Sequence, residues 1–327
     1  MRQGFFAAIT AFALVAAPAF AADKLIVQLD WLPGGDKATP YVGVVEGIFA
    51  AEGLEVTILP GRGSSDALTK VATGAADIAT GGISALMQAA AEGKVPVRAI
   101  YSVYTKQPDA MFVAKGSGID SIKALKGKTV GTATFSSSNA IWPLILSLNG
   151  MTETDVNLLK VDVGALGPML ASGRVDATIN WVTVAPATEA ILQQAGKQLE
   201  MVRWSDYGLV GYGLSLFASD RVLAERPAVV TRFLRGYAKA NALAMQDPDR
   251  AGADIKKMAP EIDAATAAAQ FAASIPLMKN EISAKDGYGV FEPKLLMQTW
   301  EGVASAQKVP VSRLDPESLV DRAVLPK

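Results

Sequence analysis

The sequence predicts an α/β protein made of two similar lobes. Short apolar segments of strand length alternate with helical segments, and glycine turns separate them, which is the pattern of a sheet covered by helices. The segment 71–79 (VATGAADIA) also resembles the segment 170–178 (LASGRVDAT). Because each copy ends a helix, turns at glycine and enters a strand after Asp, we expect two lobes that face one another.

The first lobe begins with a strand at 24–30, which ends where the turn 31–35 (WLPGG) breaks it. A helix follows over 41–51, with Pro40 at its start. The series continues with strand 56–59, helix 64–73, a short strand before Gly81, helix 84–93 and strand 95–103. This alternation implies a parallel sheet with right-handed crossovers.

After Pro108 the series starts again. We expect strands at 110–114, 129–133, 156–161 and 175–180. Helices are expected at 121–125 and 136–148, with a third that ends at 172 and a fourth that begins at about 184. A strand at 209–217 would return the chain to the first lobe. Helices at 226–245, 264–275 and 293–307 lack accompanying strands, so we expect them to pack behind that lobe.

These elements divide the chain into a discontinuous lobe 1, residues 22–107 plus 216–327, and a lobe 2 of residues 108–215. No low-complexity linker separates the lobes. The two crossings, near 106–110 and 213–217, would therefore form the hinge, because a few connecting residues absorb the backbone change of domain closure.

Composition narrows the possible functions. The chain has 327 residues, half of them hydrophobic, which suffices for two cores. A formal net charge of −1 without a basic cluster argues against nucleic acid as a partner. Histidine and cysteine are both absent, which excludes disulfides, a histidine triad, a thiol nucleophile and metal sites built on these residues. We expect no catalytic set, no metal and no cofactor.

The N-terminus has the pattern of a secretory signal peptide. Arg2 is followed by an apolar segment at 5–16 and by an A-x-A cleavage site at 19–21, so residues 1–21 are expected to be removed. A buried helix is the alternative reading. With no cysteine for a lipid anchor, we expect a freely soluble protein of a bacterial periplasm.

Several serines stand where helices begin after predicted strands. Such positions point backbone N–H groups at the carboxyl edge of a sheet, where ligands of α/β proteins bind. One serine cap is an ordinary structural feature. Convergence of several on one cleft would form a donor-lined pocket. The candidates are Ser64, Ser84, Ser136 and Ser137.

Aromatic and amide side chains add to this candidate site. Trp31 and Trp181 directly follow strands and Tyr41 lies one helical step further on, so each could stack on a flat ligand or pack in the core. Asn180 offers both a donor and an acceptor. Arg62 could contact an anionic ligand or point to solvent.

Other residues are given structural roles. The segment 61–66 (GRGSSD) looks superficially like a phosphate loop but lacks its Lys. Trp142 lies in an apolar helix and is expected in the core. Asp77 and Asp176 each precede a strand after a glycine turn, and we interpret them as caps and not as a catalytic pair.

Several segments together resemble the NMT1/THI5-like solute-binding proteins of ABC importers, over essentially the whole mature chain. The segments are 29–33 (LDWLP), 41–42 with 46–49 (YV, EGIF), 53–56 (GLEV), 60–64 (PGRGS), 74–77 (GAAD), 125–131 (LKGKTVG) and 325–327 (LPK). The resemblance implies a type II periplasmic binding fold, with a ligand trapped between two lobes that a two-crossing hinge joins.

The resemblance also has departures. Pyrimidine-binding members commonly have W-x-P-N-x-x-H-x-G, where this chain has Gly34, Lys37 and Thr39 in place of Asn, His and Gly. The Tyr-Glu pair that often follows the second-lobe strand is replaced by Trp-Val-Thr at 181–183. Eukaryotic pyrimidine synthases of similar fold look dependent on His and Cys.

We therefore expect a periplasmic protein that captures a small, flat, partly polar solute and delivers it to a membrane permease. Its ligand would be a thiamin-pyrimidine precursor, another heterocycle, a sulfonate or an aromatic carboxylate. The alternatives are a ligand-sensing adaptor for a receptor and, further off, a pyrimidine-synthase-like enzyme.

Overall fold

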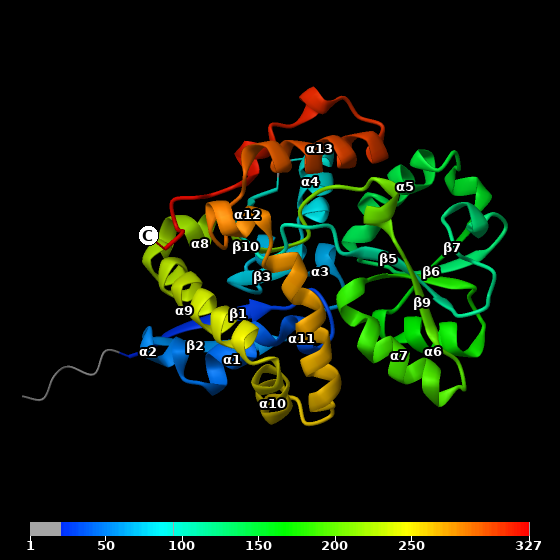
Figure 1. The fold of residues 1–327 in the computed structure, drawn as a ribbon. Helices are drawn as coiled ribbons and strands as arrows, with labels where there is room; N and C mark the ends of the chain where they lie inside the picture. Colours follow the sequence, from blue (N-terminus) through cyan, green and yellow to red (C-terminus); the bar gives the residue numbers. More distant parts are fainter. Residues whose placement is uncertain (1–20, 94, 327) are drawn as a thin grey trace, which may run out of the picture.

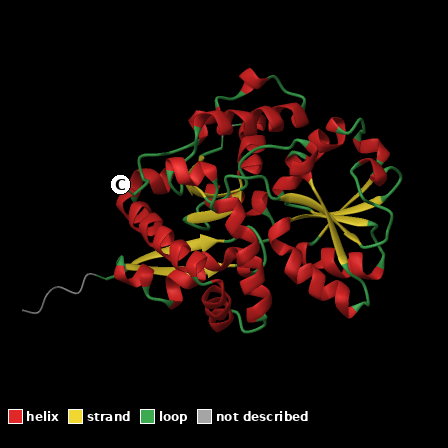
Figure 2. Cartoon of the chain, in the orientation of Figure 1, coloured by secondary structure: helices red, strands yellow, loops and turns green. Residues whose placement is uncertain are grey.

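The computed structural model describes residues 21–93 and 95–326 and consists of two α/β lobes (Figure 1). Each lobe has one five-stranded sheet with helices on its faces (Figure 2). The predicted two-lobed α/β architecture is thereby confirmed. The expected signal peptide, apart from Ala21, lies outside the described residues.

The sheet of lobe 1 has the strand order β2-β1-β3-β10-β4. Its strands are β1 (Asp23–Gln28), β2 (Leu54–Leu59), β3 (Ile78–Gly82), β4 (Val97–Ser102) and β10 (Leu214–Ser219). The sheet of lobe 2 has the order β7-β6-β8-β5-β9. Its strands are β5 (Asp109–Ala114), β6 (Thr129–Ala133), β7 (Asn157–Val161), β8 (Ala177–Trp181) and β9 (Leu199–Arg203).

Both sheets are mixed. The four strands of lobe 1 that were expected to be parallel, β1 to β4, do run in one direction, and a fifth strand, for which no direction was predicted, is inserted between β3 and β4. β10 is antiparallel to β3 and β4, and β5 is antiparallel to β8 and β9. The physical reason is that each of these two strands enters its sheet directly from a crossing between the lobes, without an intervening α-helix. The expected boundary between Ser215 and Leu216 falls inside β10.

The crossings are the segments 103–108, between β4 and β5, and 204–213, between β9 and β10. They are the only covalent connections between the two sheets in the part of the chain described here. The strand β9 was not predicted, and the strand expected at 209–217 begins only at Leu214.

The helices within the two strand series are mostly short. Lobe 1 contains α1 (Ala38–Val45), α2 (Ile48–Ala51), α3 (Ser64–Ala72) and α4 (Ile83–Glu92). Lobe 2 contains α5 (Trp142–Leu148), α6 (Leu166–Ser172) and α7 (Ala185–Gln194). Four short 3₁₀ helices carry residues that are discussed below: η1 (Gly35–Lys37), η3 (Ser137–Ala140), η5 (Val163–Ala165) and η6 (Val182–Val184).

The C-terminal helices follow β10 and pack mainly on lobe 1 (Figure 1). They are α8 (Asp220–Glu225), α9 (Pro227–Gln246), α10 (Pro248–Met258), α11 (Ala264–Met278), α12 (Glu281–Asp286) and α13 (Pro293–Gln307). Two of them also reach lobe 2, which the sequence did not predict: α11 packs on α7 and α13 packs on α5. These two helices therefore contact both lobes.

The predicted internal repeat has a structural counterpart. The Asp77 carboxylate accepts the backbone N–H of Ile26 at 2.8 Å, and Asp176 accepts that of Thr129 at 2.8 Å. The Asp before β3 thus fixes β1 in lobe 1, and the Asp before β8 fixes β6 in lobe 2. Both acids therefore have the structural role expected of them, because a carboxylate that accepts a backbone N–H replaces its lost hydration.

The hydrophobic core runs through both lobes. Phe49 and Phe233 stack in lobe 1 at a centroid distance of 5.1 Å. Trp142 is 1% exposed and packs on Trp204 at 5.7 Å, so its predicted core position is confirmed. Within the described residues, no helix has both the length and the apolar character needed to span a bilayer.

Candidate functional site

An enclosed cavity lies between the lobes. Lobe 1 contributes Asp30, Trp31, Asp36, Lys37 and Ser64, and lobe 2 contributes Ser136, Ser137, Ser138, Asn180, Trp181 and Val184. These residues lie at or after the carboxyl ends of β1, β2, β6 and β8, the edge at which ligands of α/β sheets bind. The cavity has about 320 Å³ of atom-free space, of which about 20 Å³ can hold the centre of a water molecule. We call it the inner cavity.

The lobes are closed around the inner cavity. The Ser65 N–H of lobe 1 donates to the Phe135 carbonyl of lobe 2 at 3.1 Å. Ser84 Oγ donates to the Ser137 carbonyl at 3.2 Å, beside the cavity. The close approach depends on Gly82, because a Cβ there would lie 2.2 Å from Ser137 Oγ.

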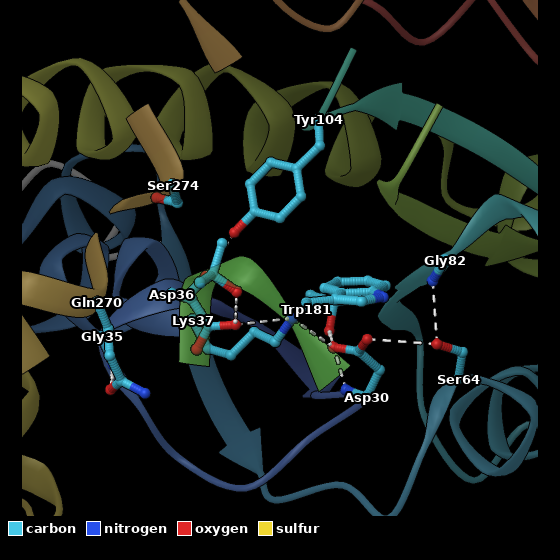
Figure 3. A network of polar contacts seen from close by, with 12 residues as sticks. Asp30, Gly35, Asp36, Lys37, Ser64, Gly82, Tyr104, Trp181, Gln270 and Ser274 are labelled. Atoms are coloured by element: carbon cyan, nitrogen blue, oxygen red, sulfur yellow. Dashed lines mark hydrogen bonds and ion pairs between the residues drawn. The ribbon is translucent and has the colours of Figure 1, made fainter. Parts of the chain in front are cut away.

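A buried ion-pair network forms the floor of the inner cavity (Figure 3). Lys37 Nζ lies 3.1 Å from Asp30 Oδ1 and 3.5 Å from Asp36 Oδ2, and all three side chains are almost fully buried. The same ammonium group lies 4.7 Å from the ring centroid of Trp181 in lobe 2. Burial lowers the pKa of Lys37, but Asp30 and Asp36 together outweigh it and raise the pKa, so the lysine stays charged.

Asp30 is held by the strand that it follows and by its neighbours. Its Oδ1 accepts the hydroxyl of Thr80 at 2.7 Å, and its backbone N–H donates to the same hydroxyl at 2.9 Å. Ser64 Oγ donates to its other oxygen at 3.3 Å. These bonds fix the position of the carboxylate at the end of β1.

Asp36 lies between the two lobes. Thr183 of η6 donates to Asp36 Oδ2 at 3.1 Å, which links lobe 2 to lobe 1. Burial raises the pKa of Asp36 although Lys37 opposes this, and the nearby charge of Asp30 adds to the rise. The single ammonium group of Lys37 thus pairs with two carboxylates, and the negative charge of Asp36 is the less completely balanced of the two.

Asp109 starts β5 and lies behind Trp181. It accepts Trp181 Nε1–H at 3.2 Å and the hydroxyl of Ser138. Burial raises its pKa to about 7, against the effect of these two donors. This carboxyl therefore titrates near neutral pH and fixes the orientation of the Trp181 ring.

A second, wider space adjoins the inner cavity, and we call it the outer chamber. The two share Trp31, Asp36, Asn180 and Val184. The outer chamber has about 620 Å³ of atom-free space, of which about 170 Å³ can hold water centres. Its additional lining is largely apolar: Leu32, Pro33, Gly34, Val163, Gly164, Leu166, Gly167, Ala187, Thr188, Ile191 and Gln270.

The structure brings six of the nine predicted site residues together in the inner cavity: Trp31, Ser64, Ser136, Ser137, Asn180 and Trp181. Ser136 caps η3 by accepting the Ser138 N–H, as expected for a serine at a helix start. Ser84 is not part of the lining but makes the contact between lobes described above.

The structure does not bring Tyr41 or Arg62 to the cavity. Tyr41 is 5% exposed and packs with Leu29 and Ile255, because α1 turns this side chain towards α10. The Arg62 side chain is exposed and lies 5.2 Å from the ring centroid of Phe135. The tight backbone contact of Gly61 with Leu29 leaves this arginine on the outside.

The sequence reasoning missed the charged part of the site, Asp30, Asp36 and Lys37, together with Val184. A signal was present, since Lys37 occupies the His position of the family motif. Charged residues are usually exposed, so nothing in the local pattern predicted that three of them would be buried together.

The chain is similar in sequence to a known protein family and to several characterised relatives. Residues 36–251, more than half of the chain, match the family model described as NMT1/THI5 like. A riboflavin-binding protein of Chloroflexus aurantiacus is 26% identical over 309 residues, which are 90% of this chain and 86% of that protein. A formylaminopyrimidine-binding protein of Halalkalibacterium halodurans is 28% identical over 233 residues, 71% of this chain and 69% of that protein.

Enzymes also occur among the relatives. A 4-amino-5-hydroxymethyl-2-methylpyrimidine phosphate synthase of Saccharomyces cerevisiae is 24% identical over 250 residues, 74% of this chain and 73% of that protein. In fold, the chain is similar to the alkanesulfonate-binding protein SsuA of Xanthomonas axonopodis pv. citri bound to MOPS. The TM-score is 0.72 at 17% identity, covering 93% of this chain and all of that one.

The two lobes, the two crossings and the closed cavity between them agree with the periplasmic binding protein fold of these structural neighbours. The match to the family model extends from η1, which carries Lys37, into α10. It thus includes every strand of the two sheets except β1, and most of the residues that line the cavity. The chain belongs to the NMT1/THI5-like family.

Proposed function

We propose that this protein is the periplasmic solute-binding component of an ABC importer. It captures a small, flat, partly polar organic solute between its lobes and presents the closed form to a membrane permease. The observation that carries the proposal is the inner cavity, which is enclosed, lies between lobes joined by two crossings, and is lined by polar and aromatic side chains of both.

The closed contacts support a trap that is driven by the ligand. Contacts between the lobes near the cavity include hydrogen bonds, such as Thr183 with Asp36 and Ser84 with Ser137, and apolar packing of Trp31 on Val163 and Leu166. A solute that touches residues of both lobes adds binding energy only in the closed state, so it shifts the equilibrium towards closure. A permease that recognises closed lobes then distinguishes loaded from empty protein.

The relatives support the same class of ligand. Two of them are named for binding riboflavin and formylaminopyrimidine, which are flat nitrogen heterocycles. Indoles at Trp31 and Trp181 suit such compounds, because aromatic side chains stack on flat rings. The space reached by water centres is small, so a solute of this kind must extend from the inner cavity into the outer chamber.

Native mass spectrometry of the protein purified from the periplasm tests the proposal. We expect one small molecule per chain, released unchanged on denaturation, and a higher melting temperature when the molecule is added back. Trp31→Ala should weaken its binding, while the same change at Trp300, a buried residue of α13 outside the cavity lining, tests for general destabilisation only. Conversion of the compound on incubation would instead favour an enzyme, and failure of any compound to bind would contradict the proposal.

A further inference from the structure

A third space borders both crossings between the lobes, and we call it the hinge groove. The crossings contribute Thr105, Lys106, Gln107, Ser205, Leu209, Val210 and Gly211. Most of its remaining lining comes from β9 and α7 of lobe 2 and from α11 and α12 on the side of lobe 1. About 790 Å³ of the groove can hold water centres, more than in the inner cavity or the outer chamber. Small-molecule sites usually have about 300–1,000 Å³.

The hinge groove is separate from the solute site. Helix α7 lies between them: Thr188 and Ile191 line the outer chamber, whereas Pro186 and Glu189 line the groove. The groove shares no lining residue with the inner cavity or the outer chamber. A molecule in the groove would therefore leave the solute site free.

One wall of the hinge groove is the apolar face of β9. Leu199, Met201 and Arg203 share this face, because side chains two residues apart in a strand point the same way. Leu199 and Met201 are partly exposed, as is Ile282 of α12, and Val210 is 57% exposed. An apolar body along the roughly 13 Å from Leu199 to Arg203 would remove this surface from water.

The charged residues of the hinge groove differ in what already binds them. Lys106 Nζ pairs with Glu281 at 3.2 Å. Glu189 accepts N–H groups at both oxygens, at 2.9 and 2.6 Å, and Asp109 accepts the two donors described above. In the described part of the chain, Arg203 has neither an ion pair nor a side-chain hydrogen bond. The charge left without a partner is thus a cation at one end of an apolar wall.

The shape of the hinge groove depends on the angle between the lobes. Its lining belongs to both lobes and to both crossings, which are the segments that absorb a rotation of one lobe against the other. The groove has its observed width with the lobes closed. A molecule that fits this width binds the closed state better and so shifts the protein towards it.

We infer that the hinge groove binds a second small molecule, an amphipathic anion with a carboxylate or sulfonate head on Arg203 and an apolar body along β9, and that this molecule strengthens solute binding. The coupling rests on the function proposed above, because it acts through closure of the lobes. By linkage, the solute strengthens binding of the second molecule by the same factor.

Probes that share one alkyl chain test the chemistry of the groove. Octanoate, neutral octanamide and cationic octylammonium are each added to ¹⁵N-labelled protein saturated with its co-purified compound, so that the solute site is filled. We expect octanoate to shift the amide resonances of Met201, Val210 and Ile282. It should bind about tenfold more tightly than octylammonium, with octanamide between them. Calorimetry with octanoate present should show an affinity for the co-purified compound that is at least about fivefold higher.

Arg203→Gln removes the charge and keeps a polar side chain at an exposed position, so the variant should fold. Octanoate should lose about 3- to 10-fold in affinity, and octanamide should bind as before. Arg174→Gln, at an exposed position of the same lobe outside the groove, is the matched control and should change neither affinity. Ala273→Phe fills part of the groove from α11 and should weaken binding of all three probes.

The outcomes separate this inference from the proposed function. If octanoate displaces the co-purified compound, or if octylammonium binds as tightly, the second site is wrong while the solute-binding function stands. A dimer that buries the groove in solution would assign this surface to a second copy of the chain and also overturn the inference. Octanoate in the groove without any change in solute affinity would refute the coupling. If octanoate occupies the groove of a protein that binds no solute, the proposed function fails and the second site stands.

Discussion

A single methyl group at Gly82 should hold the lobes apart. Gly82 has φ −70° and ψ 129°, which any residue adopts, so Gly82→Ala introduces no backbone strain. The new Cβ would lie 2.2 Å from Ser137 Oγ and 2.6 Å from Ser137 Cβ, across the interface between the lobes. Ordinary contacts begin at about 3.4 Å, so this part of the interface must open by about 1 Å.

The cost falls on the closed state alone, because Ser137 belongs to lobe 2 and Gly82 to lobe 1. Overpacking of a tight interface by one methyl group costs about 1–3 kcal/mol. The affinity for a solute that needs closure should therefore fall by about 5- to 150-fold. The stability of the solute-free protein should change little, since the open form contains no clash.

Calorimetry of solute binding, with unfolding of the empty protein measured beside it, checks both expectations. Gly93→Ala is the matched control, because nothing lies within 4 Å of a Cβ at that position and its backbone is extended. Replacing Ser137 with Gly in the Gly82→Ala variant removes the clashing atoms and should restore part of the affinity. Unchanged affinity in Gly82→Ala would refute the view that these lobes close on their ligand in the observed way.

Three further substitutions test the polar network. Lys37→Met leaves Asp30 and Asp36 without their cation, so we expect the free energy of unfolding to fall by about 3–5 kcal/mol. The loss should be larger at about pH 8 than at about pH 5, because more of the unpaired carboxyl charge is present at the higher pH. Burial raises the pKa of Asp109 to about 7. The free energy of unfolding of the wild type should therefore fall as pH rises from about 4 to about 7, by up to about 1.4 kcal/mol per pH unit. Urea unfolding of Asp109→Asn should lack this decline, and an equal decline in both would contradict the assignment. Thr183→Val removes the donor to Asp36 and should weaken solute binding by about 10-fold without changing m-values.

Local sequence patterns predicted the lobes because they reflect local physics. The repeated Gly-x-x-Asp turns place Asp77 and Asp176 where each can fix a strand, and this geometry needs few distant residues. The direction of β10 and the presence of β9 depend instead on where a crossing delivers the chain. β9 lies at the edge of its sheet with most side chains partly exposed, so it lacks the apolar run that marks an inner strand.

The candidate site was predicted only in part, for a similar reason. Residues at strand ends and helix starts, such as Trp31, Ser64 and Trp181, follow from the position of the elements along the chain. The position of Tyr41 depends on the rotation of α1 against α10, which its own sequence does not determine. The burial of Lys37 depends on two carboxylates and an indole from other segments, and only the folded chain brings these together.

Closure on a bound solute is the central claim, and a distance between the lobes measures it directly. The chain has no cysteine, so cysteines introduced at exposed Ala228 of α9 and exposed Lys160 of β7 can each carry one spin label. Double electron–electron resonance should give a longer, broader distance distribution for the empty protein. It should give a shorter, narrower one when the co-purified compound is added. The same distribution with and without saturating compound would contradict the claim that the lobes trap their ligand.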